Sequence, residues 1–283
     1  MPTATIPAPL GTPTRRQGAG VEGLQEVDLV RSQRLEAVRT GQIGSVHSWE
    51  LVTSVDGPGT RMTVFLSGCP LRCVYCHNPD TFKMKDGQDI TLDELVRRIR
   101  RYRAVFRASG GGITLSGGEV LMQPAFARNI LRAAKEMGIH TAIDTSGFLG
   151  AVASDDFLSD VDLVLLDVKS GLPETYKRLT TRELQPTIDF GDRLAKLGKT
   201  IWVRHVVVPG WTDEVANVEA VADILERWKD VVERVEVLPF HNMGQDKWDS
   251  LGLEYKLRDV RAPDPELVER IRGQFRARGF TTF

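Results

Sequence analysis

Cys69, Cys73 and Cys76 are the only cysteines of this chain, and they lie within one short segment. Thiolates at the spacing Cys-x3-Cys-x2-Cys can hold three irons of a four-iron, four-sulfur cluster. The fourth iron then lacks a cysteine, because the sequence contains no other. An incomplete set of protein ligands is typical of a catalytic metal site, in which the open position binds a small molecule. The spacing therefore indicates a catalytic cluster.

Other arrangements of the three cysteines stay open, although each explains the pattern less well. Buried structural cysteines rarely cluster this closely. A disulfide would leave one thiol over and would close a short, strained loop. Zinc could use His77 as its fourth ligand, but His77 directly follows Cys76, and adjacent side chains rarely converge on one tetrahedral ion.

Size and charge narrow the class of protein. A chain of 283 residues, 41% of them hydrophobic, can bury one core of α/β-barrel size. The 37 basic and 38 acidic residues nearly cancel, so neither nucleic acid nor an anionic membrane is an expected partner. No apolar run approaches the roughly 20 residues that span a bilayer. Arg15-Arg16 is not followed by the apolar segment of an export signal, so we expect a cytoplasmic protein.

The sequence predicts two parts of the chain. Residues 1–40 are expected to form a disordered N-terminal extension, because 1–20 are rich in Pro, Ala, Thr and Gly without apolar periodicity. Within 21–40, spaced apolar residues could form a short surface helix. Residues 41–283 are expected to form one domain.

The domain alternates short apolar strands with amphipathic helices. Six strands are predicted, at 63–66, 113–116, 141–144, 163–167, 201–207 and 235–239. Helices are predicted at 91–102, after Pro124, near Asp155, at 184–197, around 218–225, and from Asp264-Pro265 onward. Strands separated by helices imply a parallel sheet with right-handed crossovers. Six strands are too few for a closed eight-stranded barrel, so we predict an α/β partial (β/α)6 barrel; a doubly wound open sheet is the alternative.

Polar motifs follow or end the predicted strands, where the chemistry of parallel α/β folds gathers. These motifs are the cysteine loop, 116–119, 144–145, 167–169, Arg204 and His241. Their common position predicts a single active site.

Longer motifs resemble a known family. They are 55–61, 76–78, 108–112, 116–119, 138–141, 204–211 and 254–257. Together with the cysteine spacing, they resemble the radical S-adenosylmethionine (AdoMet) enzymes, and among these the activases of glycyl-radical enzymes in the branch that serves pyruvate formate-lyase. The resemblance covers the chain from about Ser45 to its end.

The resemblance implies an anaerobic oxidoreductase with one [4Fe-4S] cluster and AdoMet. It implies reductive cleavage of AdoMet to a 5′-deoxyadenosyl radical, which removes a hydrogen atom from a glycine of pyruvate formate-lyase. A flavodoxin or ferredoxin-type protein would donate the electron, and the activase would be a monomer. Asn78 leads directly to the helix at Thr91, so the chain has no inserted segment for further clusters.

The resemblance also assigns site residues. The cluster ligands would be Cys69, Cys73 and Cys76, with Arg204 as a further catalytic residue facing AdoMet or the substrate peptide. The residues around AdoMet would be Tyr75, Cys76, His77, Gly117, Gly118, Glu119, Asp144, Asp167, Val168, Lys169 and His241. Glu119 would accept from the AdoMet ammonium, and Lys169 would pair with its carboxylate. A monovalent cation, Na⁺ or K⁺, would be held by Asp144, Thr145 and Asp167. The chain has Ser146 where the family commonly has asparagine.

Three other functions are weighed against this one. The chain could activate another glycyl-radical enzyme. It could also be a radical AdoMet enzyme acting on a small molecule, although the long motifs argue against this. A zinc-stabilised protein without catalytic activity is the third.

Overall fold

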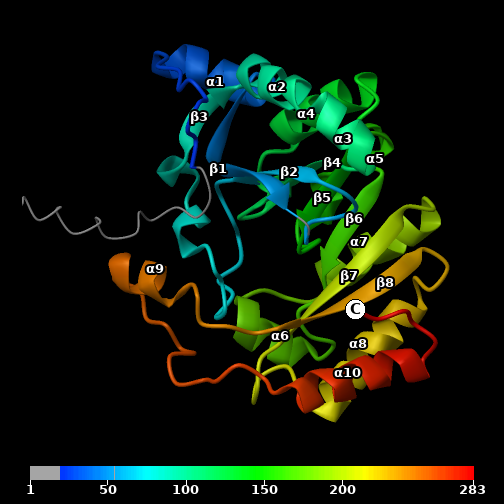
Figure 1. The fold of residues 1–283 in the computed structure, drawn as a ribbon. Coiled ribbons are helices and arrows are strands. Elements are labelled where there is room, and N and C mark those ends of the chain that lie inside the picture. Colours follow the sequence, from blue (N-terminus) through cyan, green and yellow to red (C-terminus); the bar gives the residue numbers. More distant parts are fainter. Residues whose placement is uncertain (1–19, 54) are drawn as a thin grey trace, which may run out of the picture.

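The computed structural model describes residues 20–53 and 55–283. They form one eight-stranded sheet in the order β3-β1-β2-β4-β5-β6-β7-β8 (Figure 1). The parallel strands are β2 (Arg61–Leu66), β4 (Gly112–Gly117), β5 (His140–Thr145), β6 (Leu163–Asp167), β7 (Thr200–Val207) and β8 (Val232–Pro239). All six coincide with predicted strands. Because β3 and β8 stay at opposite edges, the barrel is open, and the predicted partial barrel is confirmed.

Two strands were not predicted. β1 (Ile43–Thr53) pairs antiparallel with β2, and β3 (Gln88–Thr91) pairs antiparallel with β1. The sequence conceals them because β1 mixes polar with apolar residues and β3 is only four residues long. They extend the sheet beyond β2, so β2 is not an edge strand.

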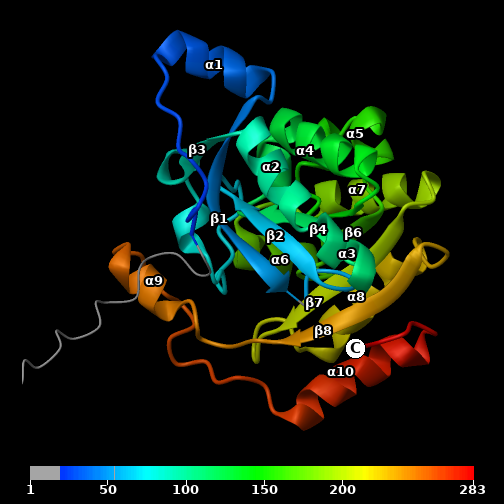
Figure 2. The same ribbon diagram turned by 45° about the horizontal axis from the view of Figure 1, so that its top comes forward.

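The predicted helices are confirmed, and further ones join them. The predicted set comprises α2 (Leu92–Arg101), α4 (Pro124–Glu136), α5 (Asp155–Ser159), α7 (Gln185–Lys196), α8 (Val215–Glu226) and α10 (Pro265–Ala277). Unpredicted helices are α3 (Arg103–Ser109), α6 (Pro173–Thr180) and α9 (Gln245–Ser250). Side chains cap two of these helices: Thr91 accepts from the amide of Glu94 at the start of α2, and Asp264 accepts from that of Leu267 at the start of α10. Figure 2 shows α10 running beside β8 and α8. None of these described helices is long and apolar enough to cross a bilayer.

The N-terminal segment requires a correction. Residues 1–19 lie outside the described residues, but 20–40 pack on the domain. Glu26 bridges to Ile90 of β3, and the Trp49 amide donates to Gly20. The predicted surface helix forms as α1 (Arg31–Arg39). For 20–40 the prediction of disorder is wrong, because these contacts use β1 and β3, which the sequence did not reveal.

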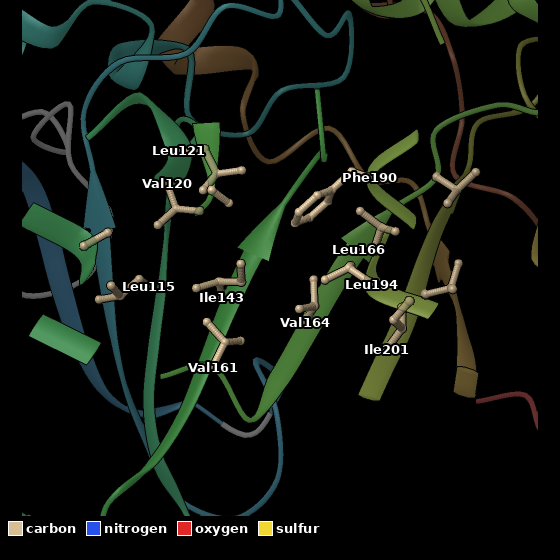
Figure 3. Close-up of a cluster of buried hydrophobic side chains, with 14 of the residues drawn as sticks. Leu115, Val120, Leu121, Ile143, Val161, Val164, Leu166, Phe190, Leu194 and Ile201 are labelled. Carbon is tan, nitrogen blue, oxygen red and sulfur yellow. The ribbon is translucent and has the colours of Figure 1, made fainter. Parts of the chain in front are cut away.

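Alternation along the strands sorts side chains between two regions. One face packs against the outer helices, and Leu115, Ile143 and Val164 of this face belong to the same buried cluster as Phe190 and Leu194 of α7 (Figure 3). The other face points into the barrel, where a small apolar cluster forms from Ala142, Leu163, Leu165 and Trp202. Asp144, Asp167 and Arg204 each follow a member of this cluster by two positions on the same strand. Because side chains alternate with a period of two, these charged residues also point inward.

Candidate active site

A cavity of about 540 Å³ opens at the carboxyl ends of the parallel strands. It brings together most of the residues predicted for the site. Those that line it are Cys69, Cys73, Tyr75, Cys76, His77, Gly117, Gly118, Asp144, Thr145, Asp167, Lys169, Arg204 and His241. Glu119 and Val168 are not among the lining residues. Residues more than 170 positions apart in sequence therefore share one site, as the strand-end argument predicted.

The cysteine loop presents three free thiols to this cavity. Backbone bonds fix the loop, since the Cys69 amide donates to Phe82 and the Val74 amide to Leu179. Burial raises the pKa of each thiol, that of Cys76 to about 12. Buried thiols of this kind become thiolates when a metal supplies the compensating charge. Three soft sulfur ligands at one cavity wall suit an iron–sulfur cluster.

His77 is engaged away from the thiols. Its Nε2 donates to the carbonyl oxygen of His241 at 3.1 Å, and the two rings stack with centroids 4.1 Å apart. Burial, reinforced by His241, lowers the pKa of His77 to about 4, so the ring is neutral at pH 7. Within residues 20–53 and 55–283, no three His, Cys, Asp or Glu side chains are grouped to hold one metal ion. This geometry disfavours the zinc alternative; in a cluster, by contrast, each thiolate binds its own iron.

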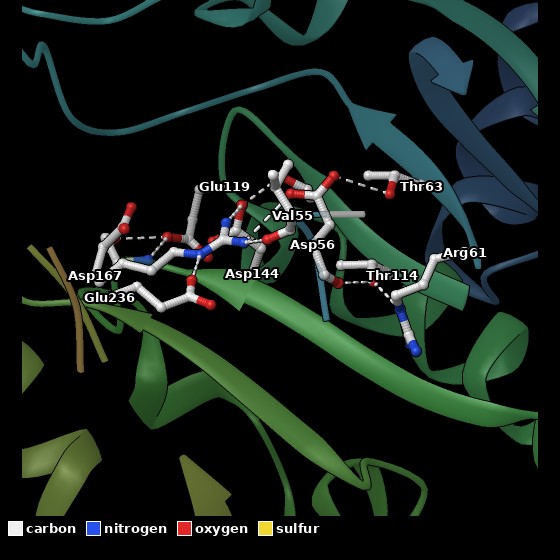
Figure 4. Close-up of polar contacts among 12 residues, drawn as sticks. Val55, Asp56, Arg61, Thr63, Thr114, Glu119, Asp144, Asp167 and Glu236 are labelled. Atoms are coloured by element: carbon white, nitrogen blue, oxygen red, sulfur yellow. Dashed lines mark hydrogen bonds and ion pairs between the residues drawn. The ribbon is translucent and has the colours of Figure 1, made fainter. Parts of the chain in front are cut away.

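Arg204 lies at the centre of a buried charge network. Figure 4 labels its partners Asp56, Asp144 and Glu236. Its side chain is 9% exposed and forms ion pairs with Glu236 at 3.1 Å, Asp56 at 3.3 Å and Asp144 at 3.4 Å. It also donates to the carbonyl oxygen of Val55. Burial opposes the charge, but the three carboxylates together raise the pKa of Arg204. The side chain therefore points inward and is not a solvated surface arginine.

Asp144 is the carboxylate of this network with an unused oxygen. Its Oδ2 accepts from Ser116 at 2.7 Å, whereas Oδ1 is buried and has no hydrogen-bond partner. Burial raises the pKa of Asp144 to about 7, although Arg204 acts in the opposite direction. A buried oxygen without a donor is costly. Its position on the cavity wall leaves it available to a ligand or cation.

Lys169 and Asp167 form a second charged pair. The Lys169 Nζ donates to Asp167 Oδ2 at 2.8 Å, and it lies 5.6 Å from the centre of the Tyr75 ring. Burial opposes the charge of Lys169, but Asp167 and its other neighbours raise its pKa well above the ordinary value. The Tyr75 hydroxyl is buried without a hydrogen-bond partner. A fixed cation beside a hydroxyl that lacks a partner suits a polar, partly anionic ligand.

Gly117 and Gly118 are needed by the fold itself. Gly117 has φ +120°, and an added Cβ would lie 2.2 Å from the Leu66 backbone. A Cβ on Gly118 would lie 2.4 Å from the carbonyl oxygen of Gly68. These contacts press the end of β4 against the start of the cysteine loop. Only glycine allows this approach.

Glu119 differs from its predicted role. Its buried carboxylate accepts from the Thr145 hydroxyl at 2.6 Å, from the Ser146 hydroxyl at 2.6 Å and amide at 3.0 Å, and from the Leu121 amide at 3.2 Å. These donors occupy both oxygens, so in this arrangement the side chain ties β4 to β5 instead of facing AdoMet. Ser146, at the position where the family commonly has asparagine, is one of these donors. Val168 also differs, because its side chain lies in the hydrophobic core.

The sequence did not reveal the partners of Arg204. Asp56 belongs to a motif that was recognised, but no contact could be assigned to it. Glu236 gave a weak signal, as an acidic residue between Val235 and Val237 in an apolar strand. Its Oε1 accepts from Arg234, whose guanidinium carbon lies 3.3 Å from the centre of the Trp202 ring. Glu236 therefore fixes one side of Arg204.

Comparison with known proteins decides the family. Residues 63–234 match the Radical SAM superfamily. The chain is 46% identical over 229 residues to the pyruvate formate-lyase-activating enzyme of Clostridium pasteurianum, covering 81% of this chain and 95% of the relative. It is 40% identical over 233 residues to the pyruvate formate-lyase 1-activating enzyme of Escherichia coli K12, covering 82% and 94%. The chain belongs to the pyruvate formate-lyase-activating enzymes of the radical SAM superfamily.

Solved structures agree with the open barrel of a radical SAM protein. A domain of a pyruvate-formate lyase-activating enzyme from Bacteroides vulgatus superposes with a TM-score of 0.52 at 22% identity, over 62% of this chain and 98% of that one. A radical SAM methyltransferase from Sphaerobacter thermophilus gives 0.59 at 18% identity, over 90% and 81%. At these identities the likeness shows the fold alone. Membership of the radical SAM family implies a [4Fe-4S] cluster and AdoMet as cofactors.

Proposed function

We propose that this protein activates pyruvate formate-lyase by generating a glycyl radical on it. The observation that carries the proposal is the single cavity in which the three cysteines meet the residues predicted to surround AdoMet. Cys69, Cys73 and Cys76 would hold the cluster. A cluster held there would supply the single electron needed for reductive cleavage of AdoMet, the chemistry that precedes removal of a hydrogen atom from the target glycine.

Different residues of the cavity are proposed to bind different parts of AdoMet. Lys169, held by Asp167, presents a fixed positive charge that suits the methionine carboxylate. Tyr75 and the stacked rings of His77 and His241 offer flat surfaces that suit adenine. Gly117 and Gly118 line the cavity, and their backbone is the part of the chain proposed to lie beside the methionine amino group. Arg204 draws Asp56 and Asp144 together and so shapes the wall that the substrate glycine must approach.

A monovalent cation belongs to the same proposal. Asp144 Oδ1 has no partner, and Thr145 and Asp167 line the same cavity. Hard oxygen ligands favour Na⁺ or K⁺ over softer ions. The cation would offset the negative charge of Asp144. Arg204 cannot neutralise this charge alone, because its single positive charge is divided among Asp144, Asp56 and Glu236.

If a cation binds at Asp144, we expect the effect of that cation on the stability of the folded protein to depend on pH. Burial raises the pKa of Asp144 from 3.8 to about 7, so between these values the folded protein holds a proton that the unfolded chain has released. Without a cation, this group therefore makes the protein less stable as pH rises through this window. A bound cation lowers this pKa and removes the loss. Melting temperatures in K⁺ and in tetramethylammonium should be equal at about pH 5 and should diverge toward pH 8.

Asp144→Asn is the matched control, because it removes the titrating group and should abolish the divergence. Identical melting curves in both salts for the native protein, together with unchanged affinity for AdoMet, would mean that no cation acts at this site.

Incubation with pyruvate formate-lyase tests the proposed function directly. We expect an anaerobic mixture of this protein, AdoMet and a reductant to give a doublet glycyl signal in electron paramagnetic resonance. The signal should be lost when the target glycine is replaced by alanine. A strong signal only with another glycyl-radical enzyme, such as a diol dehydratase, would support glycyl-radical generation but would show that pyruvate formate-lyase is not the substrate.

The remaining partner is the electron donor. We propose a flavodoxin or ferredoxin-type protein, because cluster reduction takes one electron at a time.

We also expect the protein to work as a monomer, with the open side of the barrel admitting a peptide loop. Because β3 and β8 are the opposite edges of the sheet, the barrel is open between them.

A further inference from the structure

A second hollow lies on the other face of the cysteine loop. Loop residues alternate between two spaces: Leu71, Cys73 and Tyr75 line the active-site cavity, whereas Arg72 and Val74 line a groove of about 270 Å³. The far side of the groove comes from α9 and the segment after it. α9 packs on the short 3-10 helix η1 (Pro79–Thr81). The groove thus reaches the back of the predicted cluster site.

The floor of the groove is bonded to two predicted cluster ligands. The Trp248 indole donates to the carbonyl oxygen of Cys76 at 2.8 Å, and the carbonyl oxygen of Phe82 accepts from the Cys69 amide at 3.2 Å. The rings of Phe82 and Trp248 meet edge to face, with centroids 5.8 Å apart. An electron that enters at this floor has only these two aromatic residues and the loop backbone between it and the cysteines.

The rim of the groove carries an excess of positive charge. Its exposed cations are Arg72, Lys83, Arg178 and Lys256, against the two acids Asp86 and Glu254. Within the part of the chain that the structure describes, none of these four cations forms an ion pair. Two are held by aromatic rings instead: Arg72 lies 4.6 Å from the centre of the Phe82 ring, and Arg178 lies 4.7 Å from that of Trp211.

The two faces of the loop have different requirements. The active-site face must hold AdoMet and admit the substrate glycine, so it cannot also receive an electron carrier during turnover. The groove face is free of these demands, and it combines an apolar floor with a cationic rim. A fixed excess of one charge around a hollow attracts partners of the opposite charge.

We propose that this groove docks the electron donor, an acidic protein that carries a one-electron redox group near its surface. The proposal rests on the proposed function, which requires such a donor. On docking, the donor loses one electron and the cluster gains one across the Phe82–Trp248 floor, and no atom is transferred. Electrostatic attraction sets the association rate, and the small apolar floor allows rapid release.

Charge reversal at the rim tests the surface. The reconstituted holoenzyme, without AdoMet or substrate protein, is mixed anaerobically with a reduced acidic ferredoxin, and bleaching of the cluster is followed by stopped flow. We expect Lys83→Glu/Lys256→Glu to lower the second-order rate constant at least about tenfold at low salt, with the difference shrinking as salt is added. Reduction of the same variant by dithionite should stay unchanged.

The matched control is Arg101→Glu/Arg103→Glu, which makes the same change of charge at exposed residues of α2 and α3. It should be reduced at the rate of the native protein. An equal slowing in the control would show an effect of net charge and overturn the proposal. Unchanged reduction of the groove variant would overturn it as well, and so would loss of pyruvate formate-lyase activation with normal reduction. Failure of the proposed function appears separately, as absence of AdoMet cleavage after dithionite reduction.

Discussion

Replacing Cys69, Cys73 or Cys76 singly by alanine is expected to abolish AdoMet cleavage. Each thiolate is predicted to hold one iron, and the sequence contains no other cysteine that could substitute. Two thiolates cannot keep the cluster in its catalytic form. The measurement is methionine and 5′-deoxyadenosine production after anaerobic reconstitution, together with iron and sulfide content. Retention of more than a few per cent of the activity in any variant would refute the assignment.

His77→Ala is the matched control for iron content, since His77 lies beside Cys76 in the same loop. Its Nε2 donates to His241 and its pKa is lowered to about 4, so the ring is not predicted to ligate iron. We expect about four irons per chain in this variant. Loss of iron would show that His77 takes part in metal binding. Zinc without visible absorbance in the native protein would favour the structural-zinc alternative.

Arg204→Met is expected to have the second large effect. It leaves Asp56, Asp144 and Glu236 close together in a buried region without their shared cation. Removing one partner of a buried ion pair costs about 3–5 kcal/mol, because the remaining charge is uncompensated. The free energy of unfolding should fall by that order, and AdoMet cleavage should be lost. Denaturant unfolding and product analysis provide the two measurements.

Two further variants separate charge from geometry at Arg204. Arg204→Lys keeps the charge but cannot bond to three carboxylates in fixed directions, so it should recover stability better than activity. Adding Glu236→Gln to Arg204→Met removes one uncompensated carboxylate and should restore part of the lost stability. An Arg204→Met protein as stable as the native one would contradict the buried network.

The N-terminal segment and Glu119 show where sequence reasoning reached its limit. Residues 20–40 were assigned to a disordered extension with at most a short surface helix, yet they pack on β1 and on β3, a strand too short to be recognised. Glu119 was assigned to AdoMet from its motif, but Thr145 and Ser146 satisfy it from the neighbouring strand. In both cases the deciding partner lies on another element. Local pattern carries no information about such a partner.

The sequence by itself indicated the chemistry of the cysteine loop and determined the order of the six parallel strands and of six of the helices. Both depend on local spacing: three thiols in one loop, and apolar periods of two and 3.6 residues. The tertiary structure alone decided which charges meet. Arg204 contacts Asp56 across 148 positions and Glu236 across 32, through the register of paired strands and the path of the loop before β2. It also placed α9 against the back of the cysteine loop, because packing and strand register act between segments that are distant in the sequence.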